Sequence, residues 1–180
     1  MMFPKPYADF AQRLRAPGGF LLVAAFAYWS SPSVGSLLWG LPAAIAGLLM
    51  RGWAAGHLAK NQRLATGGPY AMTRNPLYLG TLLVAAGFAI ASRQPALGAL
   101  FFAAFGLIYL PAIELEEQHL RQLFPEYEDY ARRVPRLGFR LAQQRGQPSF
   151  RLALYRKNEE YKAAAGFLAG VALLAWKIWR

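Results

Sequence analysis

A pair of adjacent glutamates is the first candidate for chemistry. Glu116 follows an apolar stretch. Ile113, Glu116, Leu120 and Leu123 follow one another at spacings of 3, 4 and 3, so they share one helix face. A carboxylate among apolar neighbours at a membrane border is costly without a partner or a function. Glu117 stands four residues before Arg121, the spacing of an ordinary surface ion pair, and Glu114 also fits a solvated position. The pattern favours Glu116 as the functional carboxylate.

A second candidate is the start of the apolar stretch at Pro76. Asn75 followed by Pro76 is typical of a helix N-cap and first helical residue. The free amides and the dipole of such a helix start favour an anion, and Arg74 adds a full charge beside it. Tyr70 and Tyr78 offer rings that can pack on a base or a cation.

A third candidate is His57, which is surrounded by small residues that let a backbone or a ligand approach closely. His57 either orients a ligand or hydrogen-bonds to the backbone, and both interpretations stay open. The three candidates together suit a ligand with an anionic end, an aromatic part and a positive centre. They contain no Ser/His/Asp set, P-loop or dinucleotide-binding glycine motif. With no cysteine and two histidines, we expect neither a disulfide nor a metal site.

Five apolar stretches must position these residues. Hydrophobic residues make up 56% of the 180 and charged residues 16%, against roughly 25% charged in soluble domains. A membrane span needs ~20 apolar residues. The sequence therefore predicts an all-α integral membrane protein with about five transmembrane helices, at Gly18–Ser30, Val34–Met50, Pro76–Ser92, Pro95–Ile113 and Ala163–Trp179.

The net charge of +11 is concentrated on one side of this arrangement. Of the 20 basic residues, all but Arg93, Lys177 and Arg180 fall on that side. The positive-inside rule makes it the cytoplasm. We expect an inner-membrane protein with a cytoplasmic N-terminus, a cofactor pocket at the cytoplasmic face, and cations in contact with anionic membrane lipids. No nucleic-acid motif accompanies the charge, so no nucleic-acid partner is expected.

At these residues the sequence resembles the isoprenylcysteine carboxyl methyltransferase family, whose relatives include the membrane phospholipid N-methyltransferases. The similarity covers about residues 51–137. That family is integral to the membrane and transfers a methyl group from S-adenosylmethionine. The resemblance rests on Gly68-Pro69-Tyr70, Arg74-Asn75-Pro76-Leu77-Tyr78-Leu79-Gly80, Glu116-Glu117 with Leu120, and Tyr127, Tyr130 and Arg133-Val134-Pro135.

The resemblance also implies site residues. It implies that Glu116, with Glu117 as the close alternative, and Arg133 lie at the cofactor or the reacting end. His57 and Arg74 are added as expected cofactor contacts. The cofactor pocket implied by the resemblance is lined by Gln62, Arg63, Leu64, Ala65, Tyr70, Asn75, Pro76, Leu77 and Tyr78.

The chain departs from the family at three places. Eukaryotic members usually have His where this chain has Asn75, which cannot titrate. They also carry an Arg for the substrate carboxylate about one turn before the glutamate pair, where this chain has Pro111, Ala112 and Ile113. The last apolar stretch is unlike the usual family ending, and its Gly166 and Gly170 form a face for helix packing.

We therefore expect one membrane domain over residues 1–180. It comprises a methyltransferase-like core at 51–137, an interfacial basic segment at 138–161 and an extra transmembrane helix at 162–180. The expected function is S-adenosylmethionine-dependent methyl transfer to a lipophilic or membrane-associated acceptor. The alternatives are an NADPH-dependent membrane reductase of the sterol or enone type, and a non-catalytic scaffold or small transporter. The sequence fixes neither the acceptor, nor the methylated atom, nor the oligomeric state.

Overall fold

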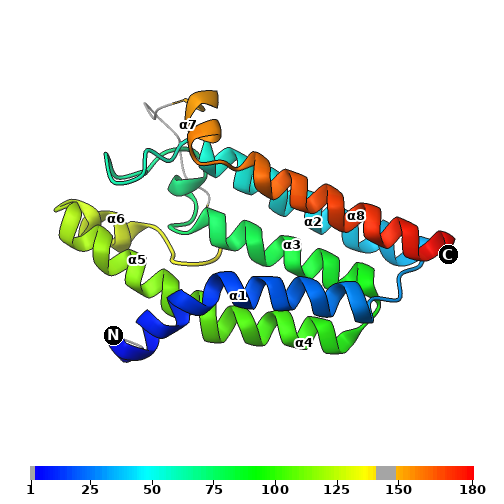
Figure 1. Cartoon of the computed structure of the whole chain (residues 1–180). Coiled ribbons are helices and arrows are strands. Elements are labelled where there is room, and N and C mark those ends of the chain that lie inside the picture. Colours follow the sequence, from blue (N-terminus) through cyan, green and yellow to red (C-terminus); the bar gives the residue numbers. More distant parts are fainter. Residues whose placement is uncertain (1–2, 141–148) are drawn as a thin grey trace.

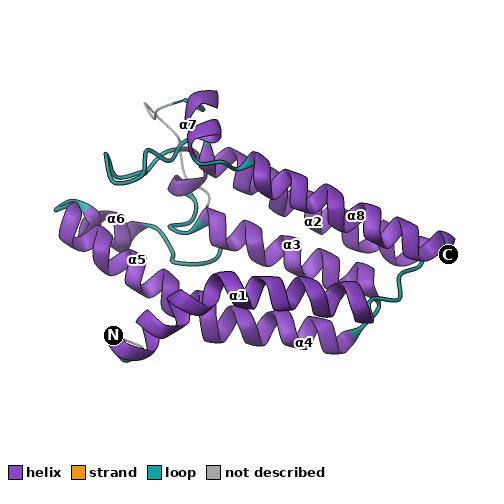
Figure 2. Cartoon of the chain, in the orientation of Figure 1, coloured by secondary structure: helices purple, strands orange, loops and turns teal. Residues whose placement is uncertain are grey.

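The computed structural model describes residues 3–140 and 149–180, and every regular element in these ranges is helical (Figures 1 and 2). A 3-10 turn, η1, spans Gly68–Ala71, and a π-helical turn, η2, spans Phe105–Tyr109. The α-helices are α1 Lys5–Trp29, α2 Val34–Ala55, α3 Pro76–Ser92, α4 Pro95–Ala104, α5 Leu110–Leu123, α6 Tyr127–Arg133, α7 Leu152–Lys157 and α8 Tyr161–Trp179.

Each predicted apolar stretch is a helix in the structure. The run Pro95–Leu123 is continuous through α4, η2 and α5, and it is long and apolar enough to cross a membrane, as are α2 and α8. The helix α3 is apolar but shorter. The all-helical membrane class is thereby confirmed, and the number of five spans stays a prediction.

The helices α2 and α3 pack with their backbones in close approach. A Cβ atom on Gly47 would lie 2.5 Å from the carbonyl oxygen of Gly80, and one on Gly87 would lie 2.5 Å from that of Gly40. Only residues without a side chain allow this distance, as at other small-residue contacts between membrane helices. The pair forms a rigid frame that fixes where α3 begins.

One end of the bundle gathers the short connections. The amide of Ser31 donates to the carbonyl of Ser92 at 2.9 Å, and the ammonium of Lys177 donates to the carbonyl of Ser30 at 2.8 Å. The N-terminus lies at the opposite end from the C-terminus (Figure 1). The two termini therefore lie at opposite ends of the bundle, and the cytoplasmic orientation stays a prediction.

The C-terminal helix α8 packs more loosely than the sequence suggests. A Cβ on Gly170 would meet the ring of Phe88 at 2.9 Å, whereas one on Gly166 would meet no atom within 4 Å. An ion pair of 2.6 Å between Arg51 of α2 and Glu160 ties down the start of α8. Only Gly170 of the predicted packing face therefore makes a tight contact. The predicted interfacial segment 138–161 includes residues 141–148, which lie outside the described residues.

Candidate active site

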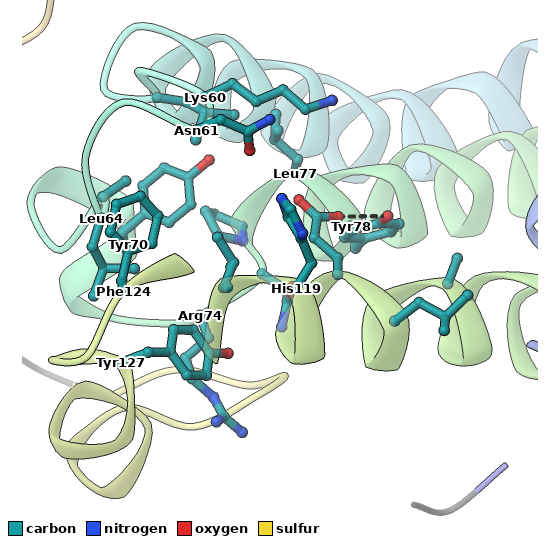
Figure 3. A pocket seen from close by; sticks show the side chains of 18 of the residues that line it. Lys60, Asn61, Leu64, Tyr70, Arg74, Leu77, Tyr78, His119, Phe124 and Tyr127 are labelled. Atoms are coloured by element: carbon teal, nitrogen blue, oxygen red, sulfur yellow. Dashed lines mark hydrogen bonds between the residues drawn. The ribbon is translucent and has the colours of Figure 1, made fainter. Parts of the chain in front are cut away.

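A pocket of about 490 Å³ opens at the N-terminal end of the bundle. It is walled by α1, the connection after α2, the first turn of α3, α5 and α6. Figure 3 shows side chains of this lining from close by. Side chains that line it include Lys60, Leu64, Tyr70, Glu116, Phe124 and Tyr127. Segments distant in sequence thus meet around one polar cavity whose size suits a small molecule, since such sites typically measure ~300–1,000 Å³.

Glu116 faces this pocket and is held from one side. The hydroxyl of Tyr78 donates to its carboxylate at 2.9 Å (Figure 3). Arg15 of α1 donates to the same hydroxyl at 3.2 Å and lies over the Tyr78 ring, 5.5 Å from its centre. Glu116 is exposed within the pocket rather than surrounded by apolar side chains. A carboxylate of fixed position therefore faces the open space.

Glu117 is the buried member of the pair, which corrects the sequence interpretation. Its side chain is 1% exposed and accepts from Arg136 at 2.8 and 3.0 Å and from Asn75 at 3.1 Å. Arg74 adds an ion pair at 3.4 Å. Arg121, its expected partner, pairs with Glu128 instead. Successive helix positions differ by about 100°, so one glutamate of α5 faces the pocket and the next faces the bundle interior.

Glu114 is the third acidic residue of α5, and its position also differs from the sequence interpretation. It is 6% exposed rather than solvated. It lies three residues before Glu117, so both fall on the inner side of the helix. Two of the three acidic residues between 114 and 117 therefore lie in the interior, and only Glu116 lines the pocket.

The start of α3 forms as predicted, with Asn75 at the N-cap and Pro76 in the first turn. The Asn75 side chain makes no capping hydrogen bond and instead donates to Glu117 and, at 3.2 Å, to the carbonyl of Arg136. The backbone of this first turn therefore faces the pocket without a side-chain cap, and residues 75–78 line it.

Three tyrosines form the aromatic side of the pocket. The hydroxyl of Tyr130 donates to the backbone carbonyl of Tyr70 at 2.7 Å, which fastens α6 to η1. The rings of Tyr127 and Tyr130 pack edge to face, 5.9 Å apart. Burial raises the pKa of Tyr70, Tyr127 and Tyr130 well above its ordinary value. All three remain neutral phenols at physiological pH, and their largely buried rings form a packed aromatic wall of the pocket.

Most of the expected cofactor contacts meet in this pocket. Four residues from the expected set lie elsewhere, and one of them is the buried Glu117. Gln62 is exposed and is not part of the lining. The Nδ1 atom of His57 is 2.9 Å from the carbonyl of Trp53, and its ring packs against Phe150. The residues brought together are Arg63, Leu64, Ala65, Tyr70, Arg74, Asn75, Pro76, Leu77 and Tyr78.

Arg133 is the fourth residue outside the lining. It is exposed at the end of α6, where its Nε donates to the carbonyl of Asp129 at 3.0 Å. Val134 and Pro135 follow it, and the chain then turns inward so that Arg136 reaches Glu117. The arginines that contact the glutamate pair are therefore Arg74 and Arg136, and Arg136 lies three residues after the expected Arg133.

Sequence reasoning missed the wall that α1 contributes. Asp9, Gln12 and Arg15 line the pocket at intervals of three residues. Ala8 and Ala11, which lie beside them on the helix, are 1% and 2% exposed. The three-residue spacing of these polar side chains could have indicated a helix. The predicted apolar stretch, Gly18–Ser30, begins after these turns.

A second cavity, of about 600 Å³, lies among the apolar helices. It is lined by α1, α2, α3, the run from α4 to η2, and α8. Arg51 and Thr81 are polar residues in its wall, and they hydrogen-bond to each other at 2.5 Å. The remaining lining is largely aliphatic and aromatic, for example Val84, Phe88 and Phe101.

The sequence of this chain matches a known family model. The model of the phospholipid methyltransferase family matches residues 21–127, which is more than half of the chain. This chain belongs to the phospholipid methyltransferase family. The match includes Asn75, Tyr78 and both glutamates of the pair, whereas Arg15 and Arg136 lie outside it.

Two curated relatives carry metal-resistance names. The chain is 36% identical over 125 residues to the cobalt-zinc-cadmium resistance protein CzcN of Cupriavidus metallidurans, covering 68% of this chain and 56% of that protein. It is 35% identical over 100 residues to the nickel-cobalt-cadmium resistance protein NccN of Alcaligenes xylosoxydans xylosoxydans, covering 54% and 47%. The chain spans about half the length of these relatives. No solved structure matches it significantly. Among the described residues no group of three or more His, Asp or Glu could hold a metal ion.

Proposed function

We propose that this protein transfers the methyl group of S-adenosylmethionine to a lipophilic acceptor, with the cofactor in the pocket beside Glu116. Membership of a membrane methyltransferase family supports the reaction class. The observation that carries the proposal is the exposed carboxylate of Glu116, fixed by Tyr78 inside a pocket of about 490 Å³.

The side chains of the pocket fit the chemical parts of this cofactor. The carboxylate of its amino-acid end suits the first turn of α3, with Lys60 and Arg63 as further cations in the wall. The adenine base suits the apolar and aromatic wall that includes Leu64 and Phe124. The positive sulfonium suits the carboxylate of Glu116.

When bound, the cofactor supplies an activated methyl group for a single displacement. The chain itself has to hold donor and acceptor in line, which can supply much of the rate of such a reaction. The hydroxyl of Tyr78 donates its proton to Glu116 and accepts from Arg15, so the carboxylate keeps one orientation. From that position Glu116 stabilises positive charge and can accept a proton that the acceptor releases.

The position of the apolar cavity supports a lipophilic acceptor. The cavity lies directly beyond the pocket along α3, where Tyr78 lines the pocket and Leu82 lines the cavity. A water-soluble cofactor would enter from the pocket end, and an acceptor from the bilayer. By the positive-inside rule the pocket end faces the cytoplasm, with α1, α2, α3, the run from α4 to α5, and α8 as the five spans.

Ligand binding provides the first test. We expect S-adenosylhomocysteine to raise the thermal stability of the purified protein, because a ligand at 100 times its Kd adds about 2.7 kcal/mol. Stabilisation by NADPH alone would indicate a reductase. Stabilisation by neither nucleotide would favour a non-catalytic membrane protein and contradict the proposal.

Methyl labelling of membrane extracts provides the second test. With labelled S-adenosylmethionine, Glu116→Gln should reduce incorporation far more than Glu126→Gln. Glu126 is exposed and lies outside the pocket lining, which makes it the matched control. Equal incorporation by the two variants would remove the role given to Glu116.

A further inference from the structure

Arg15 lies at the border between the polar pocket and the apolar cavity. The linings of the two spaces follow each other on three helices within about one turn, at Arg15 and Gly19, at Tyr78 and Leu82, and at Ala112 and Tyr109. Arg15 also lies outside the residues that the family model matches, 21–127. Arg15 therefore lies in the part of α1 that precedes the matched region.

The guanidinium of Arg15 has donors to spare. An arginine offers five N–H donors, and the one hydrogen bond of the Arg15 side chain found within residues 3–140 and 149–180 goes to the hydroxyl of Tyr78. Arg51 in the cavity wall differs, because its donors go to Glu160, Thr81 and the carbonyl of Leu77. Arg15 is thus a cation at this border that can bind a further anionic group.

The helix that carries Arg15 is firmly held. The hydroxyl of Tyr7 donates to the carbonyl of Leu107 at 2.7 Å. Ala8 and Ala11 are almost fully buried where α1 packs against the bundle, and a Cβ on Gly18 would meet Ile108 at 3.2 Å. Arg15 therefore sits on a fixed wall and not on a loose terminus.

We propose that the apolar cavity, with Arg15 at its border, binds an amphiphile that has a hydrocarbon chain and an anionic head group, a carboxylate or a phosphate. The chain would fill the cavity of about 600 Å³, and the head group would accept hydrogen bonds from Arg15. A cationic head group there would face like charge, and a neutral one would leave the guanidinium without its anion. This inference rests on the proposed function and names the chemical class of its acceptor.

The head group would then lie beside the proposed reacting carboxylate. Arg15 bonds to the same hydroxyl that holds Glu116, so its side chain is two hydrogen bonds from that group. An amphiphile bound through Arg15 therefore presents its polar end to the pocket that holds the cofactor. Arg15 lines the pocket of the methyl donor, and its free donors add a role as the residue that determines acceptor specificity.

Photocrosslinking with four matched probes tests this assignment. Each probe is a dodecyl chain with a mid-chain diazirine, and its head group is a carboxylate, a phosphate, a hydroxyl or a trimethylammonium. The protein is held in phosphatidylcholine nanodiscs, and mass spectrometry locates the label. We expect the carboxylate or the phosphate probe to label the α1 and α8 lining at about tenfold lower concentration than the hydroxyl probe, as expected for a charge-assisted hydrogen bond. The comparison of the two anionic probes identifies the head group.

Variants of Arg15 separate its charge from its place in the fold. Arg15→Gln should remove the preference for the anionic probes, and Arg15→Lys should retain most of it. Arg13→Gln is the control, since Arg13 is an exposed cation on the same helix outside the lining. Equal labelling by all four probes, label outside the cavity, or a preference that survives Arg15→Gln would overturn the inference.

Binding of S-adenosylhomocysteine to the same preparations distinguishes this inference from the proposed function. If the nucleotide binds and the four probes label equally, the acceptor class is wrong and the methyltransferase proposal stands. If the anionic probes label selectively and the nucleotide does not bind, the amphiphile site stands and the methyltransferase proposal fails.

Discussion

Replacing Glu117 by glutamine should cost stability, because this carboxylate holds three elements together. Its side chain is 1% exposed, and it pairs with Arg74, 12% exposed, and Arg136, 34% exposed. Removing one partner of a buried ion pair costs about 3–5 kcal/mol. Because Arg136 is one-third exposed, water can solvate it in the variant. The free energy of unfolding should therefore fall by about 3 kcal/mol, the lower end of that range.

The loss is measured as the free energy of unfolding in mixed micelles, by titration with sodium dodecyl sulfate and loss of helical circular dichroism. Glu128→Gln is the matched control, because Glu128 is 57% exposed and pairs with Arg121, which is 41% exposed. Such surface pairs contribute about 0–1 kcal/mol. A loss for Glu117→Gln no larger than that of the control would refute the reasoning.

Three other predictions concern helix packing, the start of α8 and alkaline pH. Gly47→Ala puts a Cβ 2.5 Å from the Gly80 carbonyl oxygen, so the free energy of unfolding should fall by about 1–3 kcal/mol; Gly35→Ala, whose Cβ has 4.0 Å of space, should not reproduce this. Glu160→Gln removes the 2.6 Å ion pair with Arg51, and trypsin should then cleave faster beside α7 than in the native protein. Burial raises the pKa of Tyr70 above its ordinary 10.0, so the folded state holds this proton more tightly than the unfolded chain. Stability should be constant below about pH 10 and fall as pH rises beyond it, which phenolate absorbance measured alongside unfolding can follow.

The helices were predictable where the ends have local signals. The prediction for α3, Pro76–Ser92, agrees with the structure at both ends, because a proline fixes its first turn and a left-handed Arg93 ends it. The prediction for α1 was too short, since the helix begins at Lys5 and not at Gly18. Its first turns are polar and amphipathic, and what holds them is contact with η2 and α5, which a search for apolar stretches does not detect.

The assignment of the two glutamates needed contacts that sequence spacing cannot supply. The spacing put Glu116 on one face of α5 with Ile113, Leu120 and Leu123, but these residues have different surroundings. Glu116 and Leu120 line the pocket, Ile113 is buried in the interior, and Leu123 is exposed. The four-residue spacing predicts a pair between Glu117 and Arg121, because spacing identifies only neighbours within one helix. Its partners come from α3 and from the segment after α6, and tertiary contacts decided its role.

The segments outside the matched region hold the two glutamates inside it. Arg15 precedes residues 21–127 and acts on Glu116 through Tyr78, while Arg136 follows them and binds Glu117 directly. The core can therefore keep the groups proposed for methyl transfer while the flanking arginines change. Arg136 stabilises a buried carboxylate, so its loss should lower stability first. Arg15 is exposed at the border of the cavity, so its loss should leave the fold intact and change which amphiphile binds. Arg136→Gln should thus lower the free energy of unfolding, whereas Arg15→Gln should leave it unchanged and alter amphiphile binding.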